Sequence, residues 1–217
     1  MSSTPALDPA AVRWSAAPAE RIGRPLLVVM HGYGSDENDL FALVPHLPRD
    51  YVVAAVRAPL TPPFPTPGWS WYPIEGLNGR DPQAATAAAR ALSSWIDAER
   101  GDAASVGLLG FSQGGAMALE TLRLHPHDYA FAVNLSGYAN PSDLETDAEL
   151  AERRPPVFWG RGARDDVIPP ALVTHTAQWL PSRVELSGRV YPELGHAVSA
   201  EELKDVATFL HKQLDAA

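Results

Sequence analysis

The stretch SVGLLGFSQGGAMALETLRL, residues 105–124, carries the clearest indication of fold in the sequence. Its first six residues are an apolar run typical of a buried strand, and its last ten have the apolar spacing of a helix. Between them, Gly110 and Gly114 stand two residues on either side of Ser112, which fits the pattern G-x-S-x-G. That pattern forms a strained strand-to-helix turn that exposes the serine, and small flanking residues let strand and helix approach each other. A plain glycine-rich turn is the alternative interpretation.

The rest of the chain alternates short apolar runs with segments of helical periodicity. Strands are predicted at 26–30, 51–56, 105–110, 131–136, 156–160 and 184–191, with an added edge strand near Val12 to Ser15. Helices are predicted at 36–44, 83–99, 115–124 and 171–180, and from Ser199, where Ser199 and Glu202 form the capping pattern S-x-x-E. Alternation of this kind predicts an α/β fold, in which a mostly parallel central sheet has helices on both faces. Functional residues then belong in loops at the carboxyl ends of the strands.

The amino-acid composition excludes or disfavours several classes of function for this chain. A chain of 217 residues with 46% hydrophobic residues is the size of one domain with one core. Its net charge of −9 disfavours a nucleic-acid partner, because the acidic surface repels phosphates. The absence of cysteine excludes disulfides, zinc–thiolate sites and a cysteine nucleophile. HPHD at 125–128 is interpreted as a solvated helix end, so no metal site is expected.

No secretory signal is recognised at the N-terminus, and the apolar runs are too short to span a bilayer. We therefore expect a soluble, cytoplasmic protein without stable membrane insertion.

The segment 59–82, PLTPPFPTPGWSWYPIEGLNGRDP, has no secondary-structure period. A loop of this length in a compact domain is usually functional or disordered, and its four large aromatic residues argue against disorder. Either these aromatics only anchor the loop to the core, or they also line a substrate pocket. On the second interpretation the substrate-binding residues are Phe64, Trp69, Trp71 and Tyr72.

A serine hydroxyl becomes a nucleophile only when a base takes its proton. His196, in ELGHAVS between the last strand and the last helix, lies on the expected functional edge. Asp165 begins the loop after the strand PVFWG and can orient that histidine, although spacing alone does not separate it from the adjacent Asp166. The resulting order of serine, aspartate and histidine is that of α/β-hydrolases rather than of chymotrypsin or subtilisin.

Acyl transfer also needs hydrogen-bond donors aimed at the developing oxyanion. The motif HGYG, residues 31–34, directly follows the strand LLVVM, where such a donor commonly lies. The backbone N–H groups of Tyr33 and Gln113 are the expected pair, and Gln113 would also open a helix whose dipole favours an anion. His31 itself is expected to be structural.

Taken together, these motifs resemble those of the phospholipase/carboxylesterase family of α/β-hydrolases, small esterases that include acyl-protein thioesterases. The matching stretches are HGYGSDENDL, RAP at 57–59, SWYPI, GFSQGGAMAL, GARDDVIP and GH at 195–196. The resemblance runs from about residue 26 to the C-terminus and implies an α/β-hydrolase fold without a large cap. We expect a single domain over residues 1–217, with residues 1–22 as an N-terminal extension or edge strand. The resemblance also implies a cofactor-independent enzyme with Ser112 as nucleophile, Asp165 as orienting acid and His196 as base.

Three functions are compatible with these residues. The first is a serine carboxylesterase acting on a small-molecule ester. The second is a thioesterase or lysophospholipase, which would use the same three residues. The third is a non-catalytic binding protein built on a hydrolase fold. The sequence leaves open whether the chain is a monomer or a homodimer.

Overall fold

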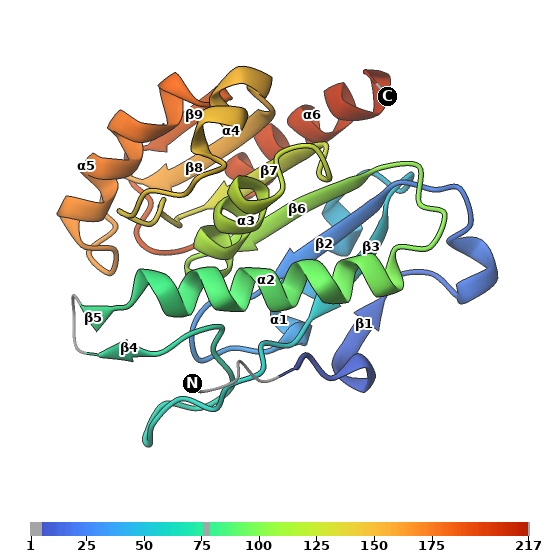
Figure 1. The fold of residues 1–217 in the computed structure, drawn as a ribbon, viewed down its shortest axis with the longest axis horizontal. Coiled ribbons are helices and arrows are strands. Elements are labelled where there is room, and N and C mark those ends of the chain that lie inside the picture. The colour runs from blue at the N-terminus through green and yellow to red at the C-terminus, as the bar shows by residue number, and fades with distance from the viewer. Residues whose placement is uncertain (1–5, 76–78, 217) are drawn as a thin grey trace.

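The computed structural model describes residues 6–75 and 79–216. A seven-stranded sheet lies between two layers of helices (Figure 1), with the strand order β1-β3-β2-β6-β7-β8-β9. β1 is antiparallel to β3, and every other neighbouring pair in this sheet is parallel. The predicted α/β fold is therefore confirmed. Residues 1–5 and 217 of the predicted domain, and residues 76–78 of the predicted 59–82 loop, lie outside the described residues.

Every predicted strand is present within one or two residues of its expected bounds. They are β1 (Val12–Trp14), β2 (Leu26–Met30), β3 (Val52–Val56), β6 (Val106–Phe111), β7 (Phe131–Leu135), β8 (Pro156–Gly162) and β9 (Glu185–Tyr191). All residues of β2, β3 and β7 are buried, which explains their continuous apolar sequences. A separate two-stranded hairpin, β4 (Ile74–Glu75) and β5 (Gly79–Arg80), lies within the segment that showed no period.

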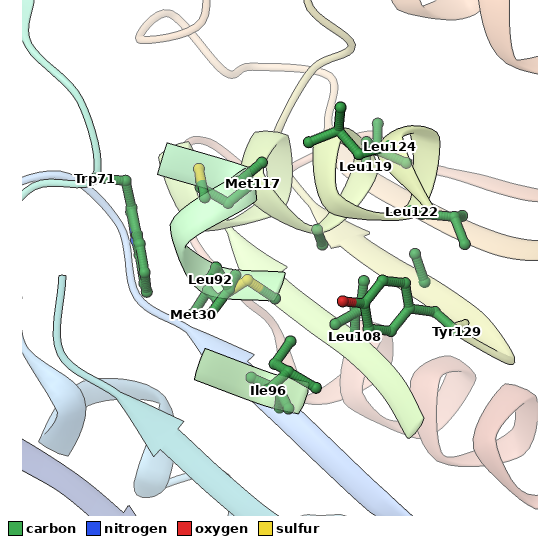
Figure 2. Packing of buried hydrophobic residues seen from close by; sticks show 14 of the residues in the cluster. Met30, Trp71, Leu92, Ile96, Leu108, Met117, Leu119, Leu122, Leu124 and Tyr129 are labelled. Carbon is green, nitrogen blue, oxygen red and sulfur yellow. The ribbon is translucent and has the colours of Figure 1, made fainter. Parts of the chain in front are cut away.

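Two layers of helices cover the sheet. The helices are α1 (Glu37–Phe41), α2 (Pro82–Glu99), α3 (Gln113–Leu124), α4 (Asp147–Arg153), α5 (Pro170–Trp179) and α6 (Ala200–Asp215). On one face, Met30 and Leu108 of the sheet pack with Leu92 of α2 and Met117 of α3 (Figure 2). On the other face, α1 and α6 cover a second apolar cluster. Each face of the sheet thus has its own hydrophobic core.

The helix predicted over 36–44 is shorter than expected. Asp36 caps it by accepting a hydrogen bond from the Asn38 amide at 2.8 Å, and α1 ends at Phe41. The chain continues as a 3₁₀ turn, Val44–His46, which contains Pro45. Proline lacks the N–H that an α-helix would need at that point, so the helix cannot run on.

The start of α6 contains a buried carboxyl group. Ser199 caps the helix as predicted, because its Oγ accepts the Glu202 amide hydrogen bond at 3.1 Å. The Glu202 side chain is completely buried. Burial raises the pKa of this carboxyl to about 7; the Ser199 backbone N–H opposes that increase and the charge of Asp205 adds to it.

This burial makes the stability of the protein depend on pH. The folded-state pKa of Glu202, about 7, lies above the ordinary value of 4.5, so the folded protein binds the proton more tightly than the unfolded chain. The stabilisation of the folded state by this tighter proton binding is complete below about pH 4.5 and is lost as the pH rises through 7. Glu202→Gln, which cannot ionise, should therefore be more stable than wild type by about 3 kcal/mol at pH 8 and by less than about 1 kcal/mol at pH 5.

Urea denaturation at the two pH values measures this difference. Glu201→Gln is the matched control, because Glu201 is exposed in the same helical turn. It should change the free energy of unfolding little and equally at both pH values. A Glu202→Gln effect of the same size at pH 5 and pH 8 would contradict the prediction.

Candidate active site

Ser112 occupies a strained turn between β6 and α3. Its backbone has φ 56° and ψ −117°, a left-handed φ that residues other than glycine seldom adopt. The flanking glycines permit this turn. A Cβ on Gly110 would lie 2.0 Å from the Gly114 carbonyl oxygen, and a Cβ on Gly114 would lie 1.9 Å from that of Met30. The backbone therefore passes so close to both positions that neither glycine has room for a side chain, which explains the G-x-S-x-G spacing.

Three predicted side chains meet in one hydrogen-bonded chain. Ser112 Oγ lies 2.9 Å from His196 Nε2, and His196 Nδ1 lies 2.8 Å from Asp165 Oδ2. A proton on Nδ1, donated to the carboxylate, leaves Nε2 as acceptor for the serine hydroxyl. The three residues follow β6, β8 and β9, and so meet at the carboxyl edge of the sheet.

The carboxylate of Asp165 is oriented by its own loop. Its second oxygen, Oδ1, accepts hydrogen bonds from the backbone amides of Val167 at 3.0 Å and Ile168 at 3.1 Å. Asp166 is exposed, and within the described part of the chain it makes no hydrogen bond to His196. The geometry favours Asp165 over its neighbour as the residue that orients the imidazole.

Phe111 is a contact that sequence reasoning missed. Its ring centroid lies 4.8 Å from that of His196, so it packs against the imidazole. The residue was visible in GFSQGG, directly before the serine, but only the fold shows that its side chain points to the histidine.

The two expected oxyanion donors come from different parts of the chain. Gln113 is the first residue of α3, so its backbone N–H has no acceptor within the helix. Tyr33 lies in the turn after β2, and both residues line the same cleft as Ser112. The next residue in that turn, Gly34, has φ 80° and donates its N–H to the Trp69 carbonyl at 2.8 Å, which ties the turn to the following loop.

The Gln113 side chain fixes that loop against α3. Its Oε1 accepts the Trp71 amide at 2.9 Å, and its Nε2 donates to the Tyr72 carbonyl at 2.7 Å. The Trp71 indole in turn donates to the His31 carbonyl at 2.9 Å. The Gln113 amide and the Trp71 indole together link the serine turn, the loop and the end of β2.

His31 has the structural position that was expected. It is buried, and its Nε2 accepts the Ala58 amide at 3.0 Å, which ties the end of β2 to the end of β3. Burial lowers the pKa of His31, although the Gly32 carbonyl opposes this. A neutral imidazole is required to accept that bond.

A cleft of about 410 Å³ opens over these residues. It is lined by Gly32, Tyr33, Ser35, Asp39, Ile74, Arg80, Phe111, Ser112, Gln113, Tyr138, Val167, Ile168 and His196. None of the four aromatics predicted to bind substrate is among them. Trp71 and Tyr72 are buried, Trp69 lies under the Arg57 guanidinium at 5.1 Å, and Phe64 is 97% exposed. Within the described part of the chain, Trp69, Trp71 and Tyr72 anchor the loop, Phe64 points into solvent, and none of the four lines the cleft.

The cleft walls come instead from residues that the sequence did not single out. Ile74 and Arg80 are cross-strand partners in the β4–β5 hairpin. Tyr138 follows β7, and its hydroxyl lies 2.7 Å from that of Tyr72. Val167 and Ile168 follow Asp165 directly. Two-residue strands and loop residues give no periodic signal, so only the fold reveals them.

Among residues 6–75 and 79–216, no group of three or more histidine, aspartate or glutamate side chains is arranged to hold a metal ion. None of the helices in the same residues has the length and apolar composition needed to span a bilayer.

Comparison with known proteins yields a consistent set of relatives. The model of a family described as phospholipase/carboxylesterase matches residues 15–214. Acyl-protein thioesterase 1 of Kluyveromyces lactis is 27% identical over 96% of this chain and 98% of its own. Carboxylesterase SOBER1 of Arabidopsis thaliana is 26% identical over 67% of this chain and 68% of its own.

Solved structures agree with this relationship. The crystal structure of esterase PE8 is 25% identical, with a TM-score of 0.77 over 93% of this chain and 98% of that one. The carboxylesterase of Bacillus cereus, at 16% identity, has a TM-score of 0.78 over 93% of each chain and supports the fold alone.

Proposed function

The chain belongs to the phospholipase/carboxylesterase family of α/β-hydrolases, and we propose that this serine hydrolase cleaves carboxylic esters through an acyl-enzyme formed on Ser112. The observation that carries this proposal is the hydrogen-bonded chain from Ser112 through His196 to Asp165, of which Ser112 and His196 line the cleft.

Acylation begins when Ser112 Oγ attacks the ester carbonyl carbon. His196 Nε2 takes the hydroxyl proton, and Asp165 stabilises the imidazolium through the bond to Nδ1. The carbonyl oxygen becomes an oxyanion, which accepts hydrogen bonds from the Tyr33 and Gln113 amides. When the tetrahedral intermediate collapses, His196 returns the proton to the departing alcohol oxygen.

Deacylation repeats these steps with water as the nucleophile. His196 removes a proton from the water, whose oxygen attacks the acyl carbon of the ester on Ser112. Collapse of the second intermediate releases the acid, and the proton returns to Ser112 Oγ. The cycle uses only side chains, backbone amides and water.

A second candidate is hydrolysis of thioesters. It is favoured by the Kluyveromyces lactis relative, which is named acyl-protein thioesterase 1 and is matched over 98% of its length. The three residues would perform the same attack, because only the leaving atom changes from oxygen to sulfur. Assays with ester and thioester substrates that share the same acyl group separate the two candidate functions.

A fluorophosphonate probe tests whether Ser112 is a nucleophile. We expect one probe per chain, located on Ser112 by peptide mass spectrometry, because an activated serine attacks phosphorus while unactivated serines do not. Prior incubation with an ester substrate should slow the labelling. Failure to label the native protein would instead favour a binding protein on a hydrolase fold.

The same preparation can then be assayed with paired oxygen esters and thioesters of identical acyl groups, from two to sixteen carbons. A sharp optimum at short oxygen esters would favour a small-ester hydrolase, and a preference for long thioesters would favour the second candidate.

A further inference from the structure

The two candidate oxyanion donors are amides that the fold leaves available. Within residues 6–75 and 79–216, neither the Tyr33 nor the Gln113 backbone N–H donates a hydrogen bond to another protein group. Both residues line the same cleft as Ser112, and a Cβ on Gly32 would lie 3.4 Å from the Ser112 Cβ. The turn therefore passes beside the nucleophile. Two amides from different segments can bind one oxygen only if the segments keep a fixed separation.

His31 fixes the direction of the Tyr33 N–H. Its Nε2 accepts the Ala58 amide at 3.0 Å, so the neutral ring carries its proton on Nδ1, which lies 2.7 Å from the Gly32 carbonyl oxygen. That carbonyl and the Tyr33 N–H belong to one planar trans peptide group, in which they point in opposite directions. A bond that holds the carbonyl therefore also aims the amide.

The loop that carries Trp69 and Trp71 also holds this turn. Trp71, which is buried in the core (Figure 2), donates its indole N–H to the His31 carbonyl at 2.9 Å. The Gly34 amide donates to the Trp69 carbonyl at 2.8 Å. The turn is thus bonded to the loop both before and after Tyr33 in the sequence.

The Gln113 side chain anchors that loop in turn. Its Oε1 accepts the Trp71 amide at 2.9 Å and its Nε2 donates to the Tyr72 carbonyl at 2.7 Å, and all three residues are buried. Leaving either backbone group buried without its partner would be costly, so these two bonds hold the loop in place. A path of hydrogen bonds therefore runs from the Gln113 side chain through Trp71 to the turn that holds Tyr33.

Resting on the proposed ester hydrolysis, we propose that the Gln113 side chain is a positioning residue for the oxyanion site. Through the loop, it holds the Tyr33 amide at the separation from the Gln113 amide that the tetrahedral oxyanion requires. Because the oxyanion forms only after attack, loss of this positioning should lower kcat and leave KM nearly unchanged. A Gln113 side chain that only stabilised the fold would lower the free energy of unfolding, while the folded molecules would keep their kcat.

The first variant is Gln113→Met, which keeps the side-chain length and helix propensity but removes both hydrogen bonds. For a p-nitrophenyl ester, kcat per probe-labelled Ser112 should fall about tenfold to a hundredfold, with KM changed by no more than about threefold. Trp71→Phe removes the indole N–H from the other end of the path and should also lower kcat. The double variant should lose less than the product of the two single losses, because both break one path.

A trifluoromethyl ketone with an alkyl chain supplies a second readout. Ser112 Oγ adds to the ketone carbon, its proton passes to His196, and the carbonyl oxygen becomes a stable hemiketal oxyanion. The inhibition constant should rise in Gln113→Met by about the factor by which kcat/KM falls, since both depend on the same two amides. A merely structural role would not change it.

Tyr129→Phe is the matched control. It removes a buried hydrogen bond, from the Tyr129 hydroxyl to Ser93 Oγ at 3.0 Å, and neither residue lines the cleft. It should lower the free energy of unfolding but leave kcat, KM and the inhibition constant unchanged. Stability loss and misplacement of the oxyanion donors are thereby separated.

Several results would overturn the inference. They are a wild-type kcat in folded Gln113→Met, a loss confined to KM, and an unchanged inhibition constant. If Gln113→Met does not fold by circular dichroism, Trp71→Phe decides, and an unchanged kcat in that variant would overturn the inference. Hydrolysis of no ester by the wild type, together with no probe label on Ser112, would overturn the proposed function as well. Wild-type ester hydrolysis with a kcat insensitive to the Gln113 side chain would overturn this inference alone.

Discussion

Ser112→Ala is expected to lower kcat/KM for a p-nitrophenyl ester by at least about three orders of magnitude without unfolding the protein. Alanine removes the oxygen that forms the acyl-enzyme, and no other group in the cleft is hydrogen-bonded to His196 Nε2 among the described residues. The oxyanion donors and the cleft survive, so a small residual rate above that of water should persist. Alanine fits the turn at least as well as serine, since both carry one Cβ.

Ser136→Ala provides the matched control. Ser136 is buried, follows the neighbouring strand β7 and also has a left-handed φ of 51°, but it does not line the cleft. Its replacement should change kcat/KM by no more than a few-fold. Circular dichroism and thermal unfolding establish that both variants are folded. Comparable esterase activity in purified Ser112→Ala would remove Ser112 from the mechanism.

The elements around Ser112 could be predicted because their signals are local. Strand β6, the turn and helix α3 are contiguous, and the two glycines mark a backbone crossing that other residues would obstruct. His196 could be placed because it falls between a recognisable strand and a recognisable helix at the functional edge. In such a sheet, the ends of the strands bring distant loops together whatever their sequence separation.

The loop aromatics could not be assigned in the same way. Whether Trp71 faces the cleft or the core depends on its bonds to Gln113 and His31, which lie about forty residues away in sequence. An aromatic-rich loop is compatible with either arrangement, since both bury the rings. The fold places Trp71 and Tyr72 in the core, and the aromatic residues that line the cleft are Tyr33, Phe111, Tyr138 and His196.

Short elements were missed for a related reason. Helix α4 has seven residues, of which Leu150 is the buried one, so its sequence shows no apolar stripe. The strands β4 and β5 have two residues each, too few for an alternating pattern. Arg80 belongs to this hairpin, which is why its position in the cleft could be found only from the structure.

Asp165→Asn should lower kcat by about three to four orders of magnitude, whereas Asp166→Asn should change it by no more than about two-fold. Among the described residues, Asp165 is the one that hydrogen-bonds to His196 Nδ1, at 2.8 Å. Asparagine keeps a carbonyl oxygen that can still accept the Val167 and Ile168 amide bonds, so the loop should hold its shape. It cannot stabilise the imidazolium, and its NH₂ group can favour the tautomer that places the proton on Nε2.

The two substitutions form a matched pair, because each removes one negative charge from adjacent positions and differs only in contact with the imidazole. General electrostatics would make their effects similar, while a direct hydrogen bond makes them differ by orders of magnitude. Equal losses in the two variants, or a larger loss in Asp166→Asn, would show that the carboxylate of Asp165 does not orient the base.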